Sequence, residues 1–285
     1  MQIIDDQLRQ MGLCCDRFAV LQDKDGITVA RVFCGEDSYI LKSFQNPVHC
    51  REIENYHLLQ SLHIPTIQVI AQTRSALLLE DLDCSPEWRL GRKEDMDDPR
   101  IAEKLAGWYR QLHQRGYDYA AEHADNLYDE SDFFTLENIA LVAAKTETEN
   151  WTSWKLLQQH FHDITQTFTK IRKTLAYNDF YYTNMVVARD GSSAFMFDYN
   201  LLGKGMAVSD LRNVTYSLSP AAQDAFLSAY GSFDQTEALL DDIIAPVVTL
   251  FLACQRQIFP GWAEEALQEV KTTLPDKIRR LFENI

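Results

Sequence analysis

The residues best suited to chemistry in this chain are an aspartate, an asparagine and a second aspartate that stand close together in its second half. Asp179 is followed five residues later by Asn184, and Asp198 comes directly after the apolar run AFMF. Between Asn184 and Asp198, two short apolar runs flank Asp190-Gly191, the usual two-residue connection of a β-hairpin. Because a hairpin brings its open ends together, we expect oxygens of Asn184 and Asp198 to lie near one another.

These three side chains match the requirements of phosphoryl transfer. Mg²⁺ takes few protein oxygens and keeps water and substrate phosphates for its other positions, so Asn184 and Asp198 are candidate metal ligands. Asp179 lies in the preceding loop, where its carboxylate can orient or deprotonate a hydroxyl group. Asp and Asn are also common in ordinary turns, and a D-x4-N spacing arises by chance. The hairpin and the second aspartate favour the catalytic interpretation.

The order of these residues resembles the aminoglycoside phosphotransferase and choline kinase family, a branch of the protein-kinase-like fold. The family pattern reads H-G-D, four residues, N, then a strand with I-D-F, and a later D, for which Asp210 is the candidate. The resemblance implies transfer of the γ-phosphate of ATP, or of GTP, to a hydroxyl group, with Mg²⁺ as the metal. It gives Asp210 a structural role in bracing the catalytic loop, although the same residue could simply cap a helix.

Two departures from the family pattern bear on activity. Tyr177-Asn178 replaces the usual His-Gly, and Gly tolerates backbone angles that Asn visits less readily. The segment between the first two predicted strands holds only Gly26 and no G-x-G-x-x-G phosphate loop. A protein substrate is therefore less expected than a small molecule. The alternative is a pseudokinase or a nucleotide-binding scaffold without turnover.

A candidate phosphate-binding lysine, Lys42, stands in the otherwise apolar strand SYILKSF. It could be an ordinary edge-strand charge, but the resemblance makes it the strand lysine that pairs with the α and β phosphates. Asn46-Pro47 then opens a helix as its cap and first residue. This helix carries Glu52 and Glu54 as possible partners of the lysine, and the resemblance favours Glu52.

The nucleotide base is expected at a hinge that follows the run ALLLEDLD, residues 76–83. The resemblance implies that backbone groups from Glu80 to Leu82 hydrogen-bond the adenine. Ile40 would cover the base from above and Val186 from below. Both residues are equally compatible with an ordinary place in the core.

The order of predicted elements indicates an α+β fold. Predicted strands cover residues 18–22, 27–33 and 38–44 as an antiparallel meander. Predicted helices cover residues 48–63, 98–116, 154–172 and 219–231. With the resemblance, this order predicts a two-lobed protein-kinase-like fold. A small nucleotide-binding sheet lobe would span residues 1–80, and a larger helical catalytic and substrate lobe residues 81–285.

Composition narrows the class of protein and of ligand. The chain has 285 residues and a net charge of −15 without any block of basic residues, so nucleic acid is not an expected partner. The start lacks the features of a signal peptide, and the most apolar window, residues 243–254, is too short to span a bilayer and predicts a buried helix. Six cysteines without C-x-x-C spacing predict reduced thiols in a cytoplasmic protein that does not enter the membrane.

The acceptor is expected to be small and to carry a positive charge. Acidic residues and tyrosines alternate closely in residues 116–137, and such a stretch could bind an ammonium group by charge and by ring-face contact. A charge run of this kind is usually a solvated surface. An amino sugar or an amino alcohol fits the first interpretation, and no oligomeric state follows from the sequence.

Overall fold

The computed structural model describes residues 2–283, and the chain divides into two compact units. The first unit comprises Met1–Arg115, Tyr177–Leu202 and Asn213–Gly231. The second comprises Gly116–Ala176, Gly203–Arg212 and Ser232–Ile285. Each unit is a set of segments that contact one another more than they contact the rest of the chain. The predicted lobe boundary near residue 80 is not tested by these units and stays a prediction.

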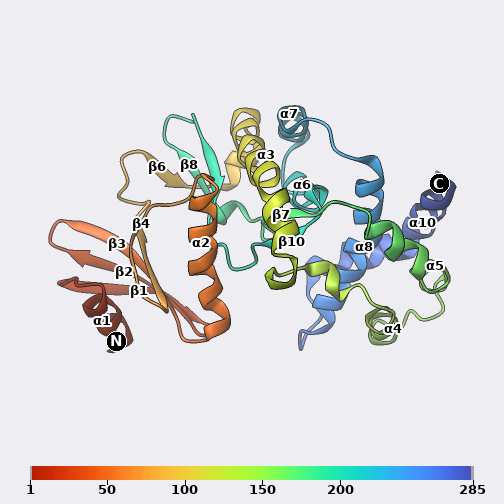
Figure 1. The fold of residues 1–285 in the computed structure, drawn as a ribbon, viewed down its shortest axis with the longest axis horizontal. Helices are drawn as coiled ribbons and strands as arrows, with labels where there is room; N and C mark the ends of the chain where they lie inside the picture. Colours follow the sequence, from red (N-terminus) through yellow and green to blue (C-terminus); the bar gives the residue numbers. More distant parts are fainter. Residues whose placement is uncertain (1, 284–285) are drawn as a thin grey trace. The chain divides into compact units, whose positions relative to one another are not determined.

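The first unit is built on a five-stranded antiparallel sheet with the order β1-β2-β3-β5-β4 (Figure 1). Its strands are β1 (Arg17–Lys24), β2 (Ile27–Cys34), β3 (Asp37–Phe44), β4 (Val69–Gln72) and β5 (Ala76–Glu80). The first three confirm the predicted meander. Asp25 and Gly26 form the connection between β1 and β2, and both have positive φ, as the tight hairpin turns require.

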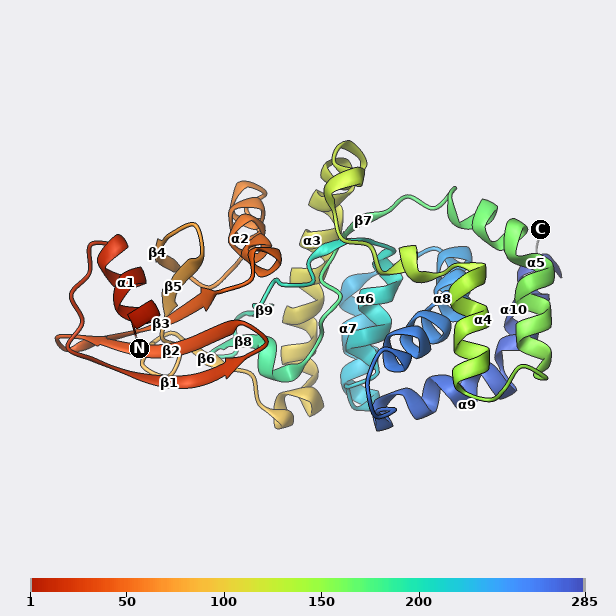
Figure 2. The same cartoon turned by 90° about the horizontal axis from the view of Figure 1, so that it is seen from below.

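Two helices accompany this sheet. Helix α1 (Gln2–Gln10) places Ile4 and Leu8 in an apolar cluster with residues of β2, β3 and β5, and Figure 2 shows it beside the strands. Helix α2 (Arg51–Ser61) follows a short 3-10 turn that starts at Pro47. Asn46 caps that turn by accepting a hydrogen bond from the Val48 backbone, which confirms the predicted start.

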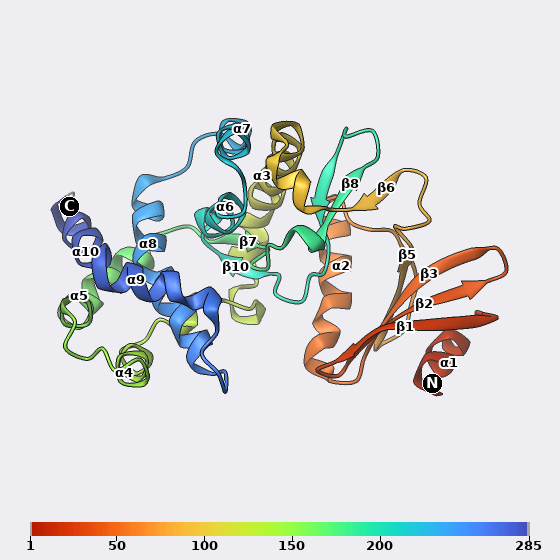
Figure 3. The same cartoon turned by 180° about the vertical axis from the view of Figure 1, so that it is seen from behind.

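A second, three-stranded sheet of the first unit contains the predicted hairpin. Its order is β6 (Trp88–Leu90), β8 (Met185–Ala188) and β9 (Ala194–Met196), and β6 lies beside β8 in Figure 3. The hairpin is confirmed with Met185 opposite Met196. Its strands are joined by residues 189–193, so the connection is longer than the predicted two-residue Asp-Gly turn. The second strand ends earlier than predicted, two residues before Asp198. Helices α3 (Pro99–Glu122) and α7 (Pro220–Tyr230) start at the predicted prolines.

The second unit is mainly helical. Its helices include α4 (Leu136–Lys145), α5 (Thr152–Phe168), α8 (Gln235–Cys254), α9 (Glu264–Thr272) and α10 (Leu274–Glu283), which pack around α8 (Figure 2). The strands β7 (Thr174–Ala176) and β10 (Gly203–Gly205) form an antiparallel pair, and α6 (Ala207–Thr215) follows β10. The predicted buried helix is confirmed as the end of α8. Within residues 2–283, no helix is long and apolar enough to cross a membrane.

The prediction that all cysteines are reduced is wrong for one pair, because Cys15 and Cys34 form a disulfide. Strand pairing sets Arg17 opposite Phe33, so the start of β1 and the end of β2 are neighbours. Spacing rules search for cysteines that are close in the chain and do not detect a pair joined by a sheet. Cys14, Cys50, Cys84 and Cys254 are free thiols.

Helix α3 also differs from its prediction, because it continues through Gly116. The glycine was expected to end the helix. A Cβ atom at this position would lie 2.7 Å from the Leu175 Cβ and backbone nitrogen, so Gly116 permits close approach to β7. The role of Gly116 is therefore to allow close packing between α3 and β7, and it does not end the helix.

Two glycine substitutions in the same helix should have opposite effects. Gly116→Ala should lower the free energy of unfolding by about 1–3 kcal/mol, because backbone and side-chain atoms of β7 must move. Gly107→Ala is the matched control, since nothing lies within 4 Å of its Cβ position. This control should raise stability by up to about 1 kcal/mol through helix propensity. Urea denaturation measures both, and equal effects would contradict the packing role of Gly116.

Candidate functional site

Lys42 is the centre of the candidate site. Its Nζ lies 2.7 Å from Glu52 Oε2 and 2.8 Å from Asp198 Oδ1. The lysine comes from β3, Glu52 from α2, and Asp198 from the segment after β9. Lys42 and Glu52 are both buried, whereas the Asp198 side chain is 30% exposed. Of the two candidate glutamates, Glu52 faces the lysine and Glu54 is exposed.

The charges of this cluster perturb one another. Burial alone would lower the pKa of Lys42, but the charges of Glu52 and Asp198 outweigh it and raise that pKa. Burial raises the pKa of Glu52 to about 7, against the opposing effect of Lys42. The lysine is therefore held as a permanent cation at neutral pH, as a group that contacts phosphates must be.

The loop before the hairpin brings Asp179 and Asn184 together. Asn184 Nδ2 donates a long hydrogen bond to Asp179 Oδ2 at 3.4 Å. Asn184 is also the last residue of the 3-10 turn Tyr182–Asn184, which leads into β8. The Phe197 backbone N–H donates to the Asn184 carbonyl oxygen at 2.9 Å. Since Phe197 directly precedes Asp198, the two open ends of the hairpin are adjacent.

Asn178 occupies the backbone conformation for which glycine is usually chosen. Its φ is +65°, in the left-handed region that Asn tolerates better than most residues do. Its Nδ2 donates to the Leu201 carbonyl oxygen at 3.0 Å, which holds the side chain in place. The preceding Tyr177 is fully buried, and its hydroxyl donates to the Phe197 carbonyl oxygen at 2.5 Å. The Tyr177-Asn178 departure thus keeps a left-handed turn directly before Asp179.

Asp179 has the electrostatic character of a base. Burial raises the pKa of its carboxyl group, the negative charge of Asp198 raises it further, and Lys42 opposes both. A carboxylate with a raised pKa binds a proton more readily than an ordinary surface aspartate does. This carboxylate could therefore accept the proton of a hydroxyl group.

The oxygens at the end of the hairpin fit a hard divalent cation. Lys42 contacts only Oδ1 of Asp198, and no described residue contacts Oδ2. The amide nitrogen of Asn184 donates to Asp179, and no described residue donates a hydrogen bond to its Oδ1. One carboxylate oxygen and one amide oxygen suit Mg²⁺ when phosphate and water oxygens complete the shell. Residues 2–283 contain no group of three or more His, Cys, Asp or Glu that could hold a metal alone.

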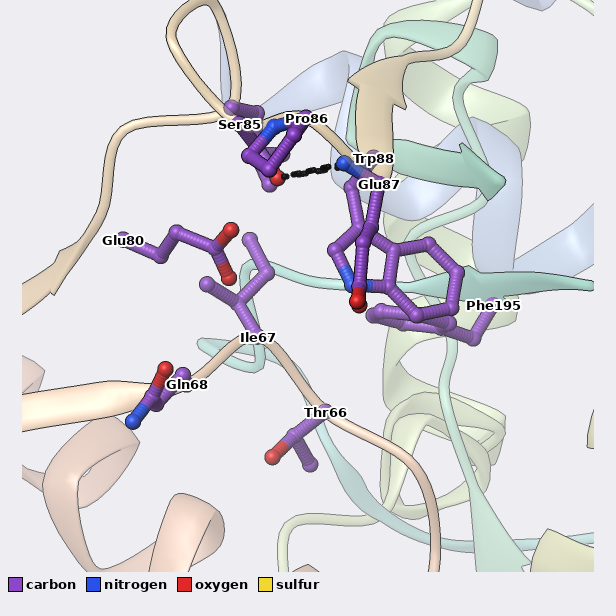
Figure 4. Close-up of a pocket in the computed structure, with 10 residues that line it drawn as sticks. Thr66, Ile67, Gln68, Glu80, Ser85, Pro86, Glu87, Trp88 and Phe195 are labelled. Atoms are coloured by element: carbon purple, nitrogen blue, oxygen red, sulfur yellow. Dashed lines mark hydrogen bonds between the residues drawn. The ribbon is translucent and has the colours of Figure 1, made fainter. Parts of the chain in front are cut away.

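A cavity of about 330 Å³ lies at the predicted hinge, and Glu80 and Leu82 both line it (Figure 4). Trp88 and Phe195 form another wall, with their ring centroids 5.1 Å apart in an edge-to-face arrangement. Neither Ile40 nor the buried Val186 lines this cavity.

The register of β5 explains why Ile40 is absent from that cavity. Ile40 pairs with Leu79, and side chains alternate between the faces of a strand, so Glu80 points to the opposite face. Glu80, the β5 residue that lines the cavity, therefore lies on the other face of that strand from Ile40 and Lys42. The adenine position on the Ile40 side stays a prediction, as do the roles of the other site residues.

Sequence reasoning missed two polar contacts of the first unit. Asp81, buried in the hinge, accepts from Ser38 Oγ at 2.7 Å and pairs with Arg31 Nε at 2.7 Å. Asn200 Nδ2 donates to Asp198 Oδ1 at 2.7 Å. The first contact depends on strand order and had no local signal, whereas the second lies only two residues from a candidate ligand. Asp210, for which a bracing role was predicted, is buried in α6 of the second unit.

A family model and several solved structures match most of this chain. The sequence model of the family described as "Phosphotransferase enzyme family" matches residues 20–242. Macrolide 2'-phosphotransferase MphH from Brachybacterium faecium is similar at 16% identity and TM-score 0.63, covering 96% of this chain and 99% of that one. Choline kinase LicA from Streptococcus pneumoniae is similar at 13% identity and TM-score 0.63, with 98% of each chain covered.

A third solved structure, a ternary complex of APH(2")-IIa with streptomycin and ATP, has 17% identity and a TM-score of 0.61, with 97% of each chain covered. At these identities the likeness concerns the fold, and it confirms the predicted α+β, protein-kinase-like class. Comparison with curated protein sequences returns no match.

The raised pKa of Asp179 predicts a stability that depends on pH. Ionising this carboxyl group costs more in the folded chain than in the unfolded chain, so stability falls as pH rises from the ordinary value of 3.8 through the folded pKa. Asp179→Asn removes this cost. The variant should therefore be more stable than wild type in urea at about pH 7 and equal to it at about pH 3.

Asp190→Asn is the matched control in the hairpin turn. Hydrogen bonds from Ser192 lower the pKa of exposed Asp190, so its replacement should not stabilise the protein at neutral pH. If Asp179→Asn is less stable than wild type at neutral pH, ionisation of Asp179 does not destabilise the folded chain, and this prediction is wrong.

Proposed function

This chain belongs to the phosphotransferase enzyme family, as its sequence predicted, and we propose that it transfers the γ-phosphate of ATP to a hydroxyl group of a small, positively charged acceptor. The observation that carries the proposal is the contact of Lys42 with both Glu52 and Asp198. It sets a permanent cation and a candidate metal ligand side by side, next to a loop with a candidate base.

Each of these residues has a separate task in the proposed reaction. Lys42, held by Glu52, steadies the α and β phosphates. Asn184 and Asp198 would hold Mg²⁺, which supplies neutralisation of the phosphate charge when it is bound. Asp179 orients the acceptor hydroxyl and takes its proton. The acceptor oxygen then forms a bond to the γ-phosphorus as the bond to the bridging oxygen breaks, and ADP leaves.

The proposed donor rests on the similar structures and on the lysine cluster. One similar structure is described as a ternary complex with ATP and another as a complex with ADP, which supports an adenine nucleotide here. A further one is described as a complex with GDP, so GTP is the donor to compare in the same assay. The small molecules named in these complexes differ, so the acceptor of this chain is inferred from the net charge of the protein instead.

The positive charge of the acceptor is proposed from the net charge of −15. In the acidic stretch of residues 116–137, Asp118 pairs with Arg172 and Asp129 pairs with Lys173, both at 2.6 Å. These ion pairs weaken the negative field that the stretch was expected to produce. Its exposed carboxylates are Asp118, Glu122, Asp125, Asp132 and Glu137. The charge of the whole chain therefore supports the proposal more than this stretch does.

Asp179→Asn tests the proposed base. Acceptor-dependent release of ADP should fall by about 10²–10⁴-fold in kcat, because the lost carboxylate acts on the proton in the transition state. The affinity for Mg-ATP should change little, and calorimetry measures it. Asp190→Asn should leave both quantities unchanged because its side chain is exposed in the turn. Turnover like that of wild type in Asp179→Asn would overturn the assignment.

The salt dependence of the best acceptor tests its charge. Amino sugars, amino alcohols and neutral sugars are screened for stimulation of ADP release. For a cationic acceptor, kcat/KM should fall steeply as the Debye length shrinks from about 10 Å at 0.1 M salt to about 3 Å at 1 M. If the best acceptor is a neutral sugar, or if kcat/KM does not change with salt, the acceptor is not recognised by a positive charge. The proposed phosphotransfer reaction would not be affected by that result.

A further inference from the structure

Asp198 is held by two donors on a single oxygen atom. Lys42 Nζ lies 2.8 Å and Asn200 Nδ2 lies 2.7 Å from the same Oδ1. No described residue contacts Oδ2. Charge-assisted hydrogen bonds are short and strong, so two donors on one oxygen restrict the rotation of a carboxylate more than one donor does. The free oxygen is consequently aimed in one direction.

The second polar atom of Asn200, its Oδ1, is buried. Within residues 2–283 it accepts no hydrogen bond. A buried carbonyl oxygen without a partner is destabilising, so the oxygen end of this side chain is not explained by stability. Rotating the amide by half a turn would only set its oxygen against the carboxylate oxygen of Asp198. The contact with Asp198 therefore fixes which way the amide points.

The backbone on both sides of Asn200 is also held. Asn55 Nδ2 donates to the Tyr199 carbonyl oxygen at 2.7 Å, from α2. Asn178 Nδ2 donates to the Leu201 carbonyl oxygen at 3.0 Å, from the loop before Asp179. The position of Asn200 is therefore set by its neighbours before any ligand binds, and its unpartnered oxygen is a prepared acceptor.

We propose that Asn200 is a positioning residue for the complex of a divalent cation with a nucleoside triphosphate. Its amide group holds Oδ1 of Asp198, so that Oδ2 is free and oriented for the cation. Its own Oδ1 accepts a hydrogen bond from a water molecule that the cation carries. This inference rests on the proposed function and adds a residue to its metal site.

Calorimetry with ATP, in the presence of Mg²⁺ and in the presence of EDTA, tests the proposal. In Asn200→Ala the gain in ATP affinity from Mg²⁺ should shrink by about 10–100-fold, as is usual for residues that orient a metal ligand. Affinity without Mg²⁺ should stay within about twofold of wild type. The urea midpoint should change little, because the lost hydrogen bond to Asp198 is offset by removal of a buried oxygen without a partner. A purely structural role would lower the midpoint and weaken both affinities together.

Two further variants keep the test decisive. Asn200→Ser retains a short donor and acceptor, so it should lose less of the Mg²⁺ effect than the alanine variant does. Asn138→Ala is the matched control: its Nδ2 donates to the Phe133 carbonyl oxygen in the second unit, and its loss should leave the Mg²⁺ effect unchanged. A full Mg²⁺ effect in both Asn200 variants would overturn the role of Asn200 alone. Absence of any Mg²⁺ effect in wild type would overturn the proposed metal site as well.

Discussion

The burial of the Lys42 ammonium group is the constraint on which the first unit depends. A charge removed from water is tolerated only when opposite charges and hydrogen bonds surround it. These partners come from two other elements, Glu52 of α2 and Asp198 after β9. Further contacts join the same elements, since Tyr56 packs edge-to-face on Tyr199 at 4.8 Å. The ion pairs and this aromatic contact together set the distance between sheet, helix and hairpin.

The segment around Asp198 and the loop before Asp179 concentrate features that do not favour stability. Asp198 and Asn178 both have left-handed backbones, the Asn200 amide oxygen is buried without a partner, and burial opposes the charge of Asp179. Such conflicts persist where the surrounding structure enforces them, and they tend to gather at functional sites. Asp25 and His63 of the first unit also have left-handed backbones. What distinguishes the segments around Asp179 and Asp198 is that three kinds of conflict occur there together.

The sequence by itself determined the features that depend on residues close together in the chain. The meander, the Asp-Gly hairpin, the cap at Asn46 and the starts at Pro99 and Pro220 are local signals, and the structure contains all of them. The spacing of Asp179, Asn184 and Asp198 also indicated the chemistry, because the hairpin between them is itself a local structure. The family pattern rests on the same short stretch.

Only the tertiary structure decided the contacts between distant segments. It placed Glu52 at Lys42 while Glu54 is exposed, joined Cys15 to Cys34, and aimed the amide of Asn200 at Asp198. It also made Gly116 a point of close packing with β7 inside a continuous helix. Each outcome depends on which strand or helix lies next to which and on the face that a side chain occupies there. Residue order along the chain does not contain that information until the elements have packed.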